Sequence, residues 1–248
     1  MTGVLIVTGA GRGIGAACAR AGGGRGYKVC VNYNTSASRA QAIADDIVKA
    51  GGQAIAVKAD VTTEAGAKSL FETVDRELGT VTALVNNAGT ILPQSRVDDC
   101  EAGTLELLFK TNVISQFLCA REAIRRMSTK HGGSGGAIVN ISSVHSRLGA
   151  PGLFVSYAAT KGAIDTFTFG LGIEVASEGI RVNAVRPGLI NTELHAIGGD
   201  PQRAQRFGST VPIGREGEPE EIADTVMWLL SDAASYVVGA MVDVGGGR

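Results

Sequence analysis

The sequence predicts an α/β fold, in which helices cover both faces of a doubly wound, mostly parallel sheet of about seven strands. Short runs rich in valine and isoleucine recur along the chain, separated by helix-length segments with apolar residues at three- and four-residue spacing. The runs are mostly continuous in apolar residues rather than alternating, as expected for strands that are covered on both faces. Strands that alternate with helices are typical of βαβ units, and therefore of a parallel sheet.

The predicted strands lie at residues 4–8, 27–33, 53–59, 83–87, 137–142, 180–186 and 241–244. The first helix should end near Ala21, because residues 21–28 are rich in glycine and each interior glycine costs roughly 1 kcal/mol relative to alanine. A long helix is expected from Val155 to about Ala176. Neither a Pro- or Ser-rich linker nor a repeat of fixed period divides the chain, so we expect one domain over residues 1–248.

Composition and charge argue against several classes of protein. Lys and Arg number 23 against 24 Asp and Glu, with a formal net charge of -1 and no basic stripe, so we expect neither a nucleic-acid partner nor membrane binding. The cysteines form no CxxC pair and the three histidines are scattered, so no metal site is predicted. Neither a signal peptide nor an apolar run of membrane-spanning length is visible, and we expect a cytoplasmic protein with reduced thiols.

The stretch TGAGRGIGAA, residues 8–17, follows the first predicted strand and opens a helix. Gly9, Gly11, Gly13 and Gly15 allow a tight turn and close approach of a ligand, and the N-terminus of the helix that follows offers free amides to a pyrophosphate. Ile14 is expected to bind the cofactor together with these glycines. A glycine-rich turn alone is a weak signal, but between a strand and a helix it predicts a dinucleotide site in a Rossmann fold. No Gly-Lys-Ser/Thr follows, which argues against nucleoside triphosphate hydrolysis. Thr8 is expected to tie the turn to a neighbouring strand.

The end of the second strand bears on the choice of cofactor. In NAD sites an acidic residue at this place binds the ribose 2′-hydroxyl, whereas this chain has Asn34, Thr35 and Ser36 and no carboxylate. Arg12, inside the glycine turn, is available to pair with a 2′-phosphate. We therefore expect NADP(H) to be preferred with NAD possible; the alternative is that Arg12 is merely solvated and both cofactors bind.

Tyr157 and Lys161 lie in VSYAATKGAIDTF, residues 155–167, at a spacing that places both on one face of a helix. Such a pair is often ordinary helix surface. Here it accompanies the glycine turn, NNAG at 86–89 and RPG at 186–188, in this order. With these motifs the chain resembles, over essentially its whole length, the short-chain dehydrogenase/reductases, and among them bacterial 3-oxoacyl-carrier-protein reductases and glucose 1-dehydrogenases.

The resemblance implies catalytic roles. Tyr157 would be the acid/base, and Lys161 would bind the nicotinamide ribose and lower the pKa of Tyr157. Ser143 would hold the substrate carbonyl, with the adjoining Ser142 as the alternative. Asn112 would support a water-borne proton relay, unless it only bonds backbone. Elementary electrostatics agrees, because a free tyrosine has a pKa of about 10 and nearby positive charge favours the phenolate.

The resemblance also implies cofactor contacts outside the glycine turn. Asn86, which precedes one group of these contacts, is expected to hold strands together rather than to touch the cofactor. The contacts, besides Tyr157 and Lys161, are Asp60 and Val61 at the adenine, Asn87, Ala88 and Gly89 behind the cofactor, and Pro187, Gly188, Ile190 and Thr192 at the carboxamide and pyrophosphate.

Residues 189–221 form a long mixed segment, and the resemblance implies a substrate lid at about 189–216. Apolar residues there and before Tyr157 suggest a pocket for a modest, partly apolar carbonyl compound; they are Leu153, Phe154, Leu194 and Phe207. His145 and His195 either line this pocket or are structural. The arginines at 203, 206 and 215 either contact an acyl-carrier protein or are solvated.

The expected function is that of an NADP(H)-dependent oxidoreductase that interconverts a secondary alcohol and a ketone or aldehyde by hydride transfer. Within this class, sugar oxidation as in a glucose 1-dehydrogenase is the alternative to 3-oxoacyl or carbonyl reduction. Outside it, the alternatives are a catalytically silent NADP-binding regulator and a nucleotide-binding scaffold. The predicted helix from Val155 is apolar around most of its circumference and residues 236–247 resemble an interface of the family, so we expect a homotetramer.

Overall fold

The computed structural model describes residues 3–248, in which seven parallel strands form one sheet in the order β3-β2-β1-β4-β5-β6-β7. The strands are β1 (Val4–Val7), β2 (Lys28–Tyr33), β3 (Gln53–Lys58), β4 (Ala83–Asn86), β5 (Gly136–Ile141), β6 (Ile180–Pro187) and β7 (Met241–Val244). Every neighbouring pair is parallel, so the α/β doubly wound prediction is confirmed. The predicted strands agree with these bounds to within one residue at each end.

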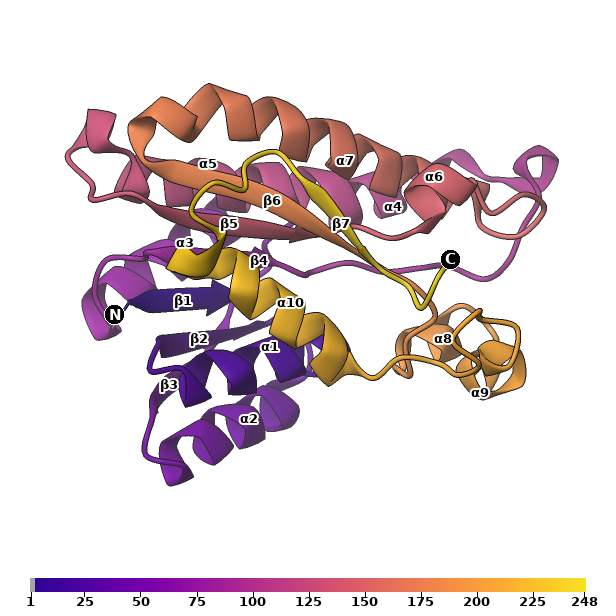
Figure 1. The fold of residues 1–248 in the computed structure, drawn as a ribbon, viewed down its shortest axis with the longest axis horizontal. Coiled ribbons are helices and arrows are strands. Elements are labelled where there is room, and N and C mark those ends of the chain that lie inside the picture. The colour runs from indigo at the N-terminus through magenta and orange to yellow at the C-terminus, as the bar shows by residue number, and fades with distance from the viewer. Residues whose placement is uncertain (1–2) are drawn as a thin grey trace.

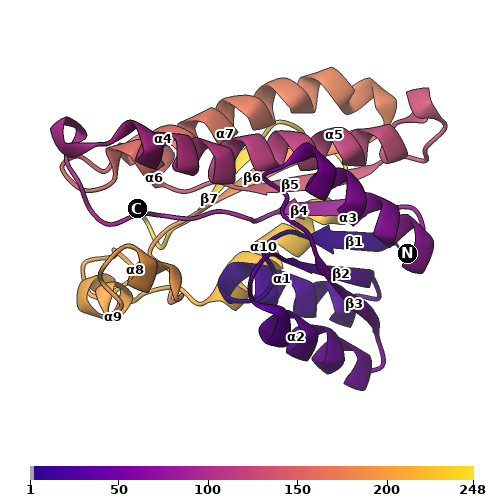
Figure 2. The same ribbon diagram turned by 180° about the vertical axis from the view of Figure 1, so that it is seen from behind.

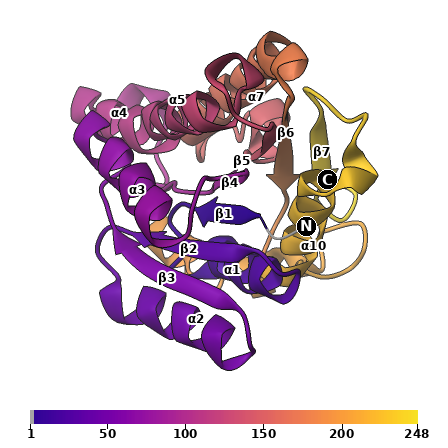
Figure 3. The ribbon, with the colours of Figure 1, turned by 90° about the vertical axis from the view of Figure 1, so that its left-hand side faces the viewer.

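Helices cover both faces of the sheet (Figures 1 and 3). On one face lie α1 (Gly13–Gly24), α2 (Ala37–Lys49) and α10 (Pro219–Leu230). On the other lie α3 (Glu64–Glu77), α4 (Ala102–Phe109), α5 (Ser115–Met127) and α7 (Val155–Val175); Figure 2 shows α3, α4 and α5 in front, with α7 behind them. Each layer buries its own apolar cluster against the sheet, which accounts for strands that are apolar on both faces.

The strand order reverses between β1 and β4, which are neighbours although two strands separate them in the sequence. In open α/β sheets a ligand crevice forms at such a switch point, outside the carboxyl ends of the strands. The glycine turn after β1 and the NNAG segment after β4 therefore emerge side by side. The short helices α6 (His145–Leu148), α8 (Leu194–Ile197) and α9 (Arg203–Gly208) lie beyond the same edge (Figure 1).

The expectation that the first helix ends near Ala21 is wrong, because α1 continues to Gly24. Close packing explains the glycines there. A methyl group on Gly22 would overlap the Leu5 side chain of β1, and one on Gly23 would overlap Ile47 of α2. The intrinsic cost of glycine in a helix is thus offset by an approach that alanine would prevent.

A membrane-spanning helix and a metal site each require a particular arrangement of the described residues. No helix among them combines the length and apolar character needed to cross a membrane. Within residues 3–248 there is also no group of three or more His, Cys, Asp or Glu side chains arranged to hold a metal ion.

Candidate active site

Hydrogen bonds to the segment that follows β4 hold the glycine turn in place. The Thr8 hydroxyl accepts hydrogen bonds of 3.0 Å from the amides of both Asn87 and Ala88. The Asn87 side chain donates in return to the carbonyl oxygens of Thr8 and Gly9, at 2.9 and 3.0 Å. The role predicted for Thr8 is confirmed, and the turn is fixed to β4 before any ligand binds.

The turn leaves backbone amides free at the start of α1. Gly9 and Gly13 adopt φ values of +62° and +52°, which glycine tolerates best, and a methyl group on Gly9 would come within 3.0 Å of the Ala88 Cα. Helix α1 has no acidic residue in its first turn and no side-chain cap from Arg12. Its unsatisfied N–H groups therefore fit a pyrophosphate.

A cleft of about 380 Å³ runs from this turn across the sheet edge. It brings together most of the residues predicted for the site: Gly9, Gly11, Arg12, Gly13, Ile14, Asn34, Thr35, Ser36, Asn87, Ala88, Gly89, Ser143, Tyr157, Lys161, Pro187, Gly188, Ile190 and Thr192. Four predicted residues, Gly15, Asp60, Val61 and Asn112, do not line it.

These four residues contact other parts of the protein, and the roles predicted for them stay predictions. A methyl group on Gly15 would collide with Asn87 and with the carbonyl of Gly9, so Gly15 permits close packing of α1 on the turn. The Asp60 carboxylate accepts hydrogen bonds from the amide and hydroxyl of Thr62, at 3.0 and 2.7 Å, and Val61 is buried in the core.

Asn112 is completely buried, and its side chain is occupied by protein groups. Its Oδ1 accepts from the Thr90 amide at 2.7 Å, and its Nδ2 donates to the Thr90 carbonyl at 2.9 Å and the Thr160 hydroxyl at 3.1 Å. It lies in a π-helical turn, Lys110–Ile114, of the kind often found at functional sites. Its side chain therefore joins the segment after β4 to α7.

The two adjoining serines after β5 have different environments. The Ser142 hydroxyl is buried and donates to the Lys161 carbonyl and to the Asp165 carboxylate, at 3.2 and 2.7 Å. Asp165 is paired in turn with Arg186 at 2.7 Å. Ser143 contacts the Tyr157 hydroxyl and accepts from the His145 amide at 3.2 Å. Ser142 thus braces α7, whereas Ser143 is available at the reacting end of the cleft.

Tyr157 and Lys161 are both buried on the same side of α7. Burial raises the pKa of Tyr157 to about 12, and the hydrogen bond with Ser143 opposes this rise. Burial also lowers the pKa of Lys161 to about 8, against the opposing effect of Asp165. At neutral pH Tyr157 is therefore protonated and neutral, whereas Lys161 still carries its charge but loses it more easily than a free lysine. Both groups are sensitive to any charge placed beside them.

At the other end of the cleft, two arginines meet one carboxylate. Glu193, which lines the cleft, is paired with Arg39 of α2 at 2.5 Å and with Arg12 at 3.6 Å. The pKa of the Glu193 carboxyl is lowered, first by Arg39 and less by Arg12. Sequence reasoning missed Arg39, although a cation three residues beyond Ser36 was a signal that could have suggested it.

The reacting end of the cleft, defined here as the part lined by Ser143, Tyr157 and Lys161, borders an apolar cluster that contains Tyr157 itself. The cluster's other members are Ile91, Ala150, Phe154, Ala158, Leu194 and Ile197. The ring of His145 lies edge-on to Tyr157, with centroids 6.1 Å apart, and His195 lines the cleft with a ring nitrogen 2.8 Å from the Ile190 carbonyl oxygen. Phe154 and Leu194 thus lie as predicted, whereas Leu153 is partly exposed and belongs to no buried cluster.

Comparison with known proteins agrees with this geometry. A family model described as enoyl-(acyl carrier protein) reductase matches residues 9–248. The chain belongs to the short-chain dehydrogenase/reductase family. It is therefore an oxidoreductase of a family that uses NAD(P) cofactors.

Several relatives of this short-chain dehydrogenase/reductase match along almost their whole length. The chain is 50% identical over 245 residues to the uncharacterized oxidoreductase YgfF of Escherichia coli, covering 99% of both chains. It is 37% identical to a 3-oxoacyl-[acyl-carrier-protein] reductase of Synechocystis, covering 98% and 96%, and 36% identical to glucose 1-dehydrogenase 2 of Bacillus subtilis, covering 98% and 93%. A crystal structure of a dehydrogenase/reductase from Sinorhizobium meliloti 1021 superposes with a TM-score of 0.91 at 31% identity, covering 100% and 95%.

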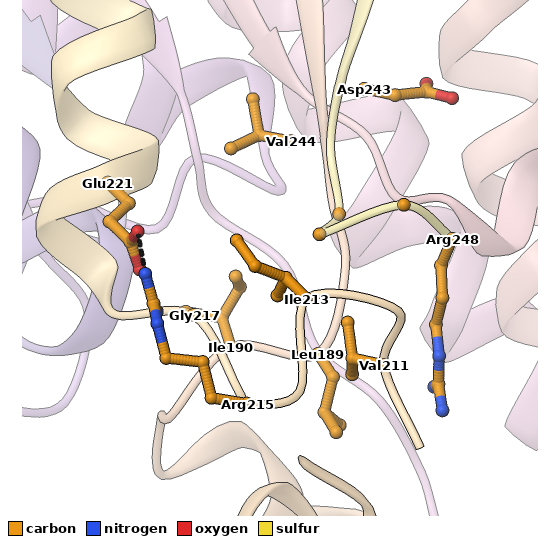
Figure 4. Close-up of a pocket in the computed structure, with 13 residues that line it drawn as sticks. Leu189, Ile190, Val211, Ile213, Arg215, Gly217, Glu221, Asp243, Val244 and Arg248 are labelled. Carbon is orange, nitrogen blue, oxygen red and sulfur yellow. Dashed lines mark hydrogen bonds and ion pairs between the residues drawn. The ribbon is translucent and has the colours of Figure 1, made fainter. Parts of the chain in front are cut away.

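The dehydrogenase/reductase chain has a second cavity, of about 490 Å³, between residues 189–221 and the C-terminal residues 243–248 (Figure 4). Aliphatic side chains, such as Leu189, Val211 and Ile213, line much of it. Its main polar feature is the ion pair of Arg215 with Glu221, at 2.7 Å, in which both charges are already satisfied. It shares Ile190 with the cofactor cleft but holds none of the predicted catalytic residues.

Proposed function

We propose that this protein is an NADP(H)-dependent oxidoreductase that interconverts a secondary alcohol and a ketone or aldehyde, with Tyr157 as the acid/base. One observation carries the proposal: Ser143, Tyr157 and Lys161 converge in a cleft that also contains the glycine turn at the helix N-terminus. The protein acts as one dinucleotide-binding domain, with a substrate lid at about residues 189–216.

The cofactor supplies or accepts the hydride, and side chains of the protein donate or accept the proton. In reduction, the Tyr157 hydroxyl donates its proton to the carbonyl oxygen, which the Ser143 hydroxyl holds by a hydrogen bond. A pKa raised to about 12 keeps Tyr157 protonated at neutral pH, which is the form that reduction requires. In oxidation the same oxygen takes the proton back, and this direction benefits from higher pH.

Lys161 tunes this proton transfer through its charge. Its ammonium donates a 2.7 Å hydrogen bond to the Ile141 carbonyl, which positions it, while burial makes its charge act through a poorly screened medium. We assign it the nicotinamide ribose as a second hydrogen-bond partner. Asn112 supports this end by fixing Thr90 and Thr160, and we retain for it the proposed support of a proton relay.

The preference for NADP(H) is supported by the pair of Arg12 and Arg39. Both guanidinium groups already bind one carboxylate, that of Glu193, which shows that an anion fits between them. A 2′-phosphate carries more negative charge than a carboxylate and offers more acceptor oxygens, so it would compete well for both arginines. Asn34, Thr35 and Ser36 line the same part of the cleft and add hydrogen-bond donors.

Carbonyl reduction is favoured over sugar oxidation by the apolar cluster around Tyr157. The names of the relatives include both a 3-oxoacyl-[acyl-carrier-protein] reductase and a glucose 1-dehydrogenase. A sugar presents hydroxyl groups on every side and needs polar partners for them, whereas Ile91, Phe154 and Leu194 provide apolar surface. We therefore propose a partly apolar ketone or aldehyde as the substrate.

We also propose a homotetramer. Phe117 of α5 and Phe169 and Ile173 of α7 are 49%, 54% and 62% exposed, which is unusual for large apolar side chains gathered on packed helices. Trp228 and the fully exposed Tyr236 lie on segments that flank β7, the edge strand of the sheet. Sedimentation at micromolar concentration tests this, and a monomeric mass would refute it.

The direct test of the function is NADPH consumption with a panel of carbonyl compounds: a 3-oxoacyl thioester, a diketone, an aromatic ketone and an aldehyde. NADP reduction with glucose runs in parallel. The proposal predicts turnover of at least one carbonyl compound. Tight NADPH binding without turnover of any compound, glucose included, would favour the catalytically silent regulator instead.

A further inference from the structure

Arg203 differs from every other arginine in residues 3–248. The guanidinium groups of all the others hydrogen-bond or pair with an acidic side chain, a carbonyl or a hydroxyl. That of Arg203 has no such partner within the described chain. The nearby Asp200 pairs with Arg206 instead. The Arg203 side chain is half-buried, so its guanidinium donors are partly shielded from water and remain available to an anionic ligand.

Aromatic rings hold this cation in place. The Cζ of Arg203 lies 5.3 Å from the ring centroid of Phe154 and 5.2 Å from that of Phe207. Contacts of this kind attract the guanidinium through the ring faces and leave its N–H edges available for hydrogen bonds. Arg203 opens α9, within the proposed lid, so its position is set by the same segment that borders the substrate.

Phe154 connects Arg203 to the reacting end of the cleft. Phe154 is 4% exposed and belongs to the apolar cluster of Tyr157. His145 lies near both rings: its ring centroid is 6.2 Å from that of Phe154 and 6.1 Å from that of Tyr157. The Nδ1 atom of His145 is buried without a hydrogen-bond partner.

The charges around this region are predominantly positive. Arg203 and Arg248 are close enough to help lower the pKa of His145, whose burial is the main cause and brings it to about 4. His145 is therefore a neutral, polar group at neutral pH, and Arg203 is the cation with free donors. Arg248 is bonded to the Thr210 hydroxyl, and Asp200 is the acidic side chain nearby, already paired.

We propose that Arg203 binds a carboxylate of the substrate, so that the protein acts on oxo acids, and on the corresponding hydroxy acids, whose carboxylate is separated from the carbonyl by a carbon chain. The separation follows from the position of Arg203, which contacts Phe154 rather than Tyr157 or Ser143. The chain would lie along Phe154 and the apolar cluster, with His145 beside it. This inference rests on the proposed carbonyl reduction and adds the substrate class to it.

The test compares oxo acids of increasing chain length, from pyruvate through levulinate to longer members, each with its uncharged methyl ester. In the wild type, kcat/KM should be higher for a longer acid than for its ester, and pyruvate should be poor. In Arg203→Gln, KM for the acid should rise roughly tenfold to a hundredfold, the loss expected for a hydrogen bond to a charged group, while the ester is unaffected. Arg215→Gln, in the same proposed lid, is the control and should change neither, because its partner is Glu221 and Asp200 stays paired with Arg206.

A second measurement distinguishes the loss of a carboxylate contact in Arg203→Gln from a general disturbance of the proposed lid. Long-chain carboxylates without an oxo group should inhibit ester reduction competitively in the wild type, and much less in Arg203→Gln. Equal kcat/KM for acid and ester in the wild type, or an equal loss for both in Arg203→Gln, would overturn the inference while leaving the carbonyl reductase intact. If neither acids nor esters nor other ketones are turned over, it is the proposed function that fails.

Discussion

The ammonium of Lys161 lies 5.6 Å from the centre of the Tyr157 ring, and both side chains are buried on the same side of one helix. Burial raises the pKa of Tyr157 and lowers that of Lys161, so the protein alone disfavours the charged form of each. A positive charge near Tyr157 stabilises the phenolate. The pair is therefore arranged so that its protonation responds to a bound cofactor and substrate.

The buried Lys161 should make stability depend on pH. Its pKa falls from 10.5 to about 8 on folding, so between these values the unfolded chain binds the proton and the folded protein does not. Unfolding then takes up a proton, and the free energy of unfolding contributed by this group rises with pH across this window. Three buried cysteines with raised pKa values act in the opposite direction above about pH 9.

Lys161→Met isolates this contribution. Urea denaturation of both proteins from neutral to alkaline pH should show the variant gaining stability over the wild type at neutral pH, with the gain shrinking as pH rises towards 10. The cysteines are common to both proteins and cancel in the difference. A difference that does not change with pH would contradict the assignment of a depressed pKa to Lys161.

Ser142 and Ser143 provide a matched pair of substitutions. Ser143→Ala should lower kcat/KM by at least about tenfold with little change in stability, because its hydroxyl holds the substrate carbonyl. Ser142→Ala should lower stability by about 1–3 kcal/mol, because it removes the hydrogen-bond donor of the buried Asp165 Oδ1 atom, while Arg186 still pairs with Oδ2. Kinetics and thermal unfolding of both variants distinguish them, and the reverse pattern would assign the catalytic role to Ser142.

The pairing of Glu193 with two arginines predicts how the cofactor preference can be changed. Arg12→Ala and Arg39→Ala should each weaken NADPH binding by about tenfold or more and leave NADH binding nearly unchanged, since each removes a hydrogen bond to a charged group. Glu193→Gln should strengthen NADPH binding by removing a competing anion. Arg20→Ala, which breaks an exposed ion pair with Asp46, is the control. Calorimetric titration measures these affinities, and a wild type that binds NADH as tightly as NADPH would refute the preference.

The glycines of α1 predict opposite effects of the same substitution. Gly22→Ala should destabilise the protein by about 1–3 kcal/mol, because the new methyl group overlaps Leu5 in a packed core. Gly24→Ala should stabilise it by about 0.5 kcal/mol, because no atom lies within 4 Å of the added methyl group and alanine is the better helix former. Equal effects in denaturant titrations would show that the packing argument is wrong.

The sequence predicts strands well in this protein because most of them contain a short run rich in valine and isoleucine, as in Val4–Val7 and Gly136–Ile141, between helix-length segments. It also predicts most of the cleft, because the glycine turn, Ser143, Tyr157 and Lys161 all follow or face the carboxyl ends of these strands. Local propensity failed at Gly22, where tertiary packing outweighs the cost of glycine in a helix.

Contacts between distant segments account for most of what sequence reasoning missed. Arg39 and Glu193 are 154 residues apart, and no spacing rule connects them. In the sequence nothing distinguishes Arg203 from the other arginines of the proposed lid. Its lack of a partner becomes visible only in the structure, where Asp200 pairs with Arg206. Asp60 and Val61 do not line the cleft, and the loop after β3 closes on itself through Thr62. Their contact with the adenine stays a prediction.

The measurement that tests the account most directly is the turnover of Tyr157→Phe with a carbonyl substrate of the wild type, combined with the Kd of NADPH. Loss of the proton donor should lower kcat by roughly 10²–10⁴-fold, while NADPH binding and thermal stability remain close to wild type. Tyr236→Phe, at a fully exposed position, is the control and should keep full activity. A Tyr157→Phe variant that turns over as fast as the wild type would contradict the assignment of Tyr157 as the acid/base.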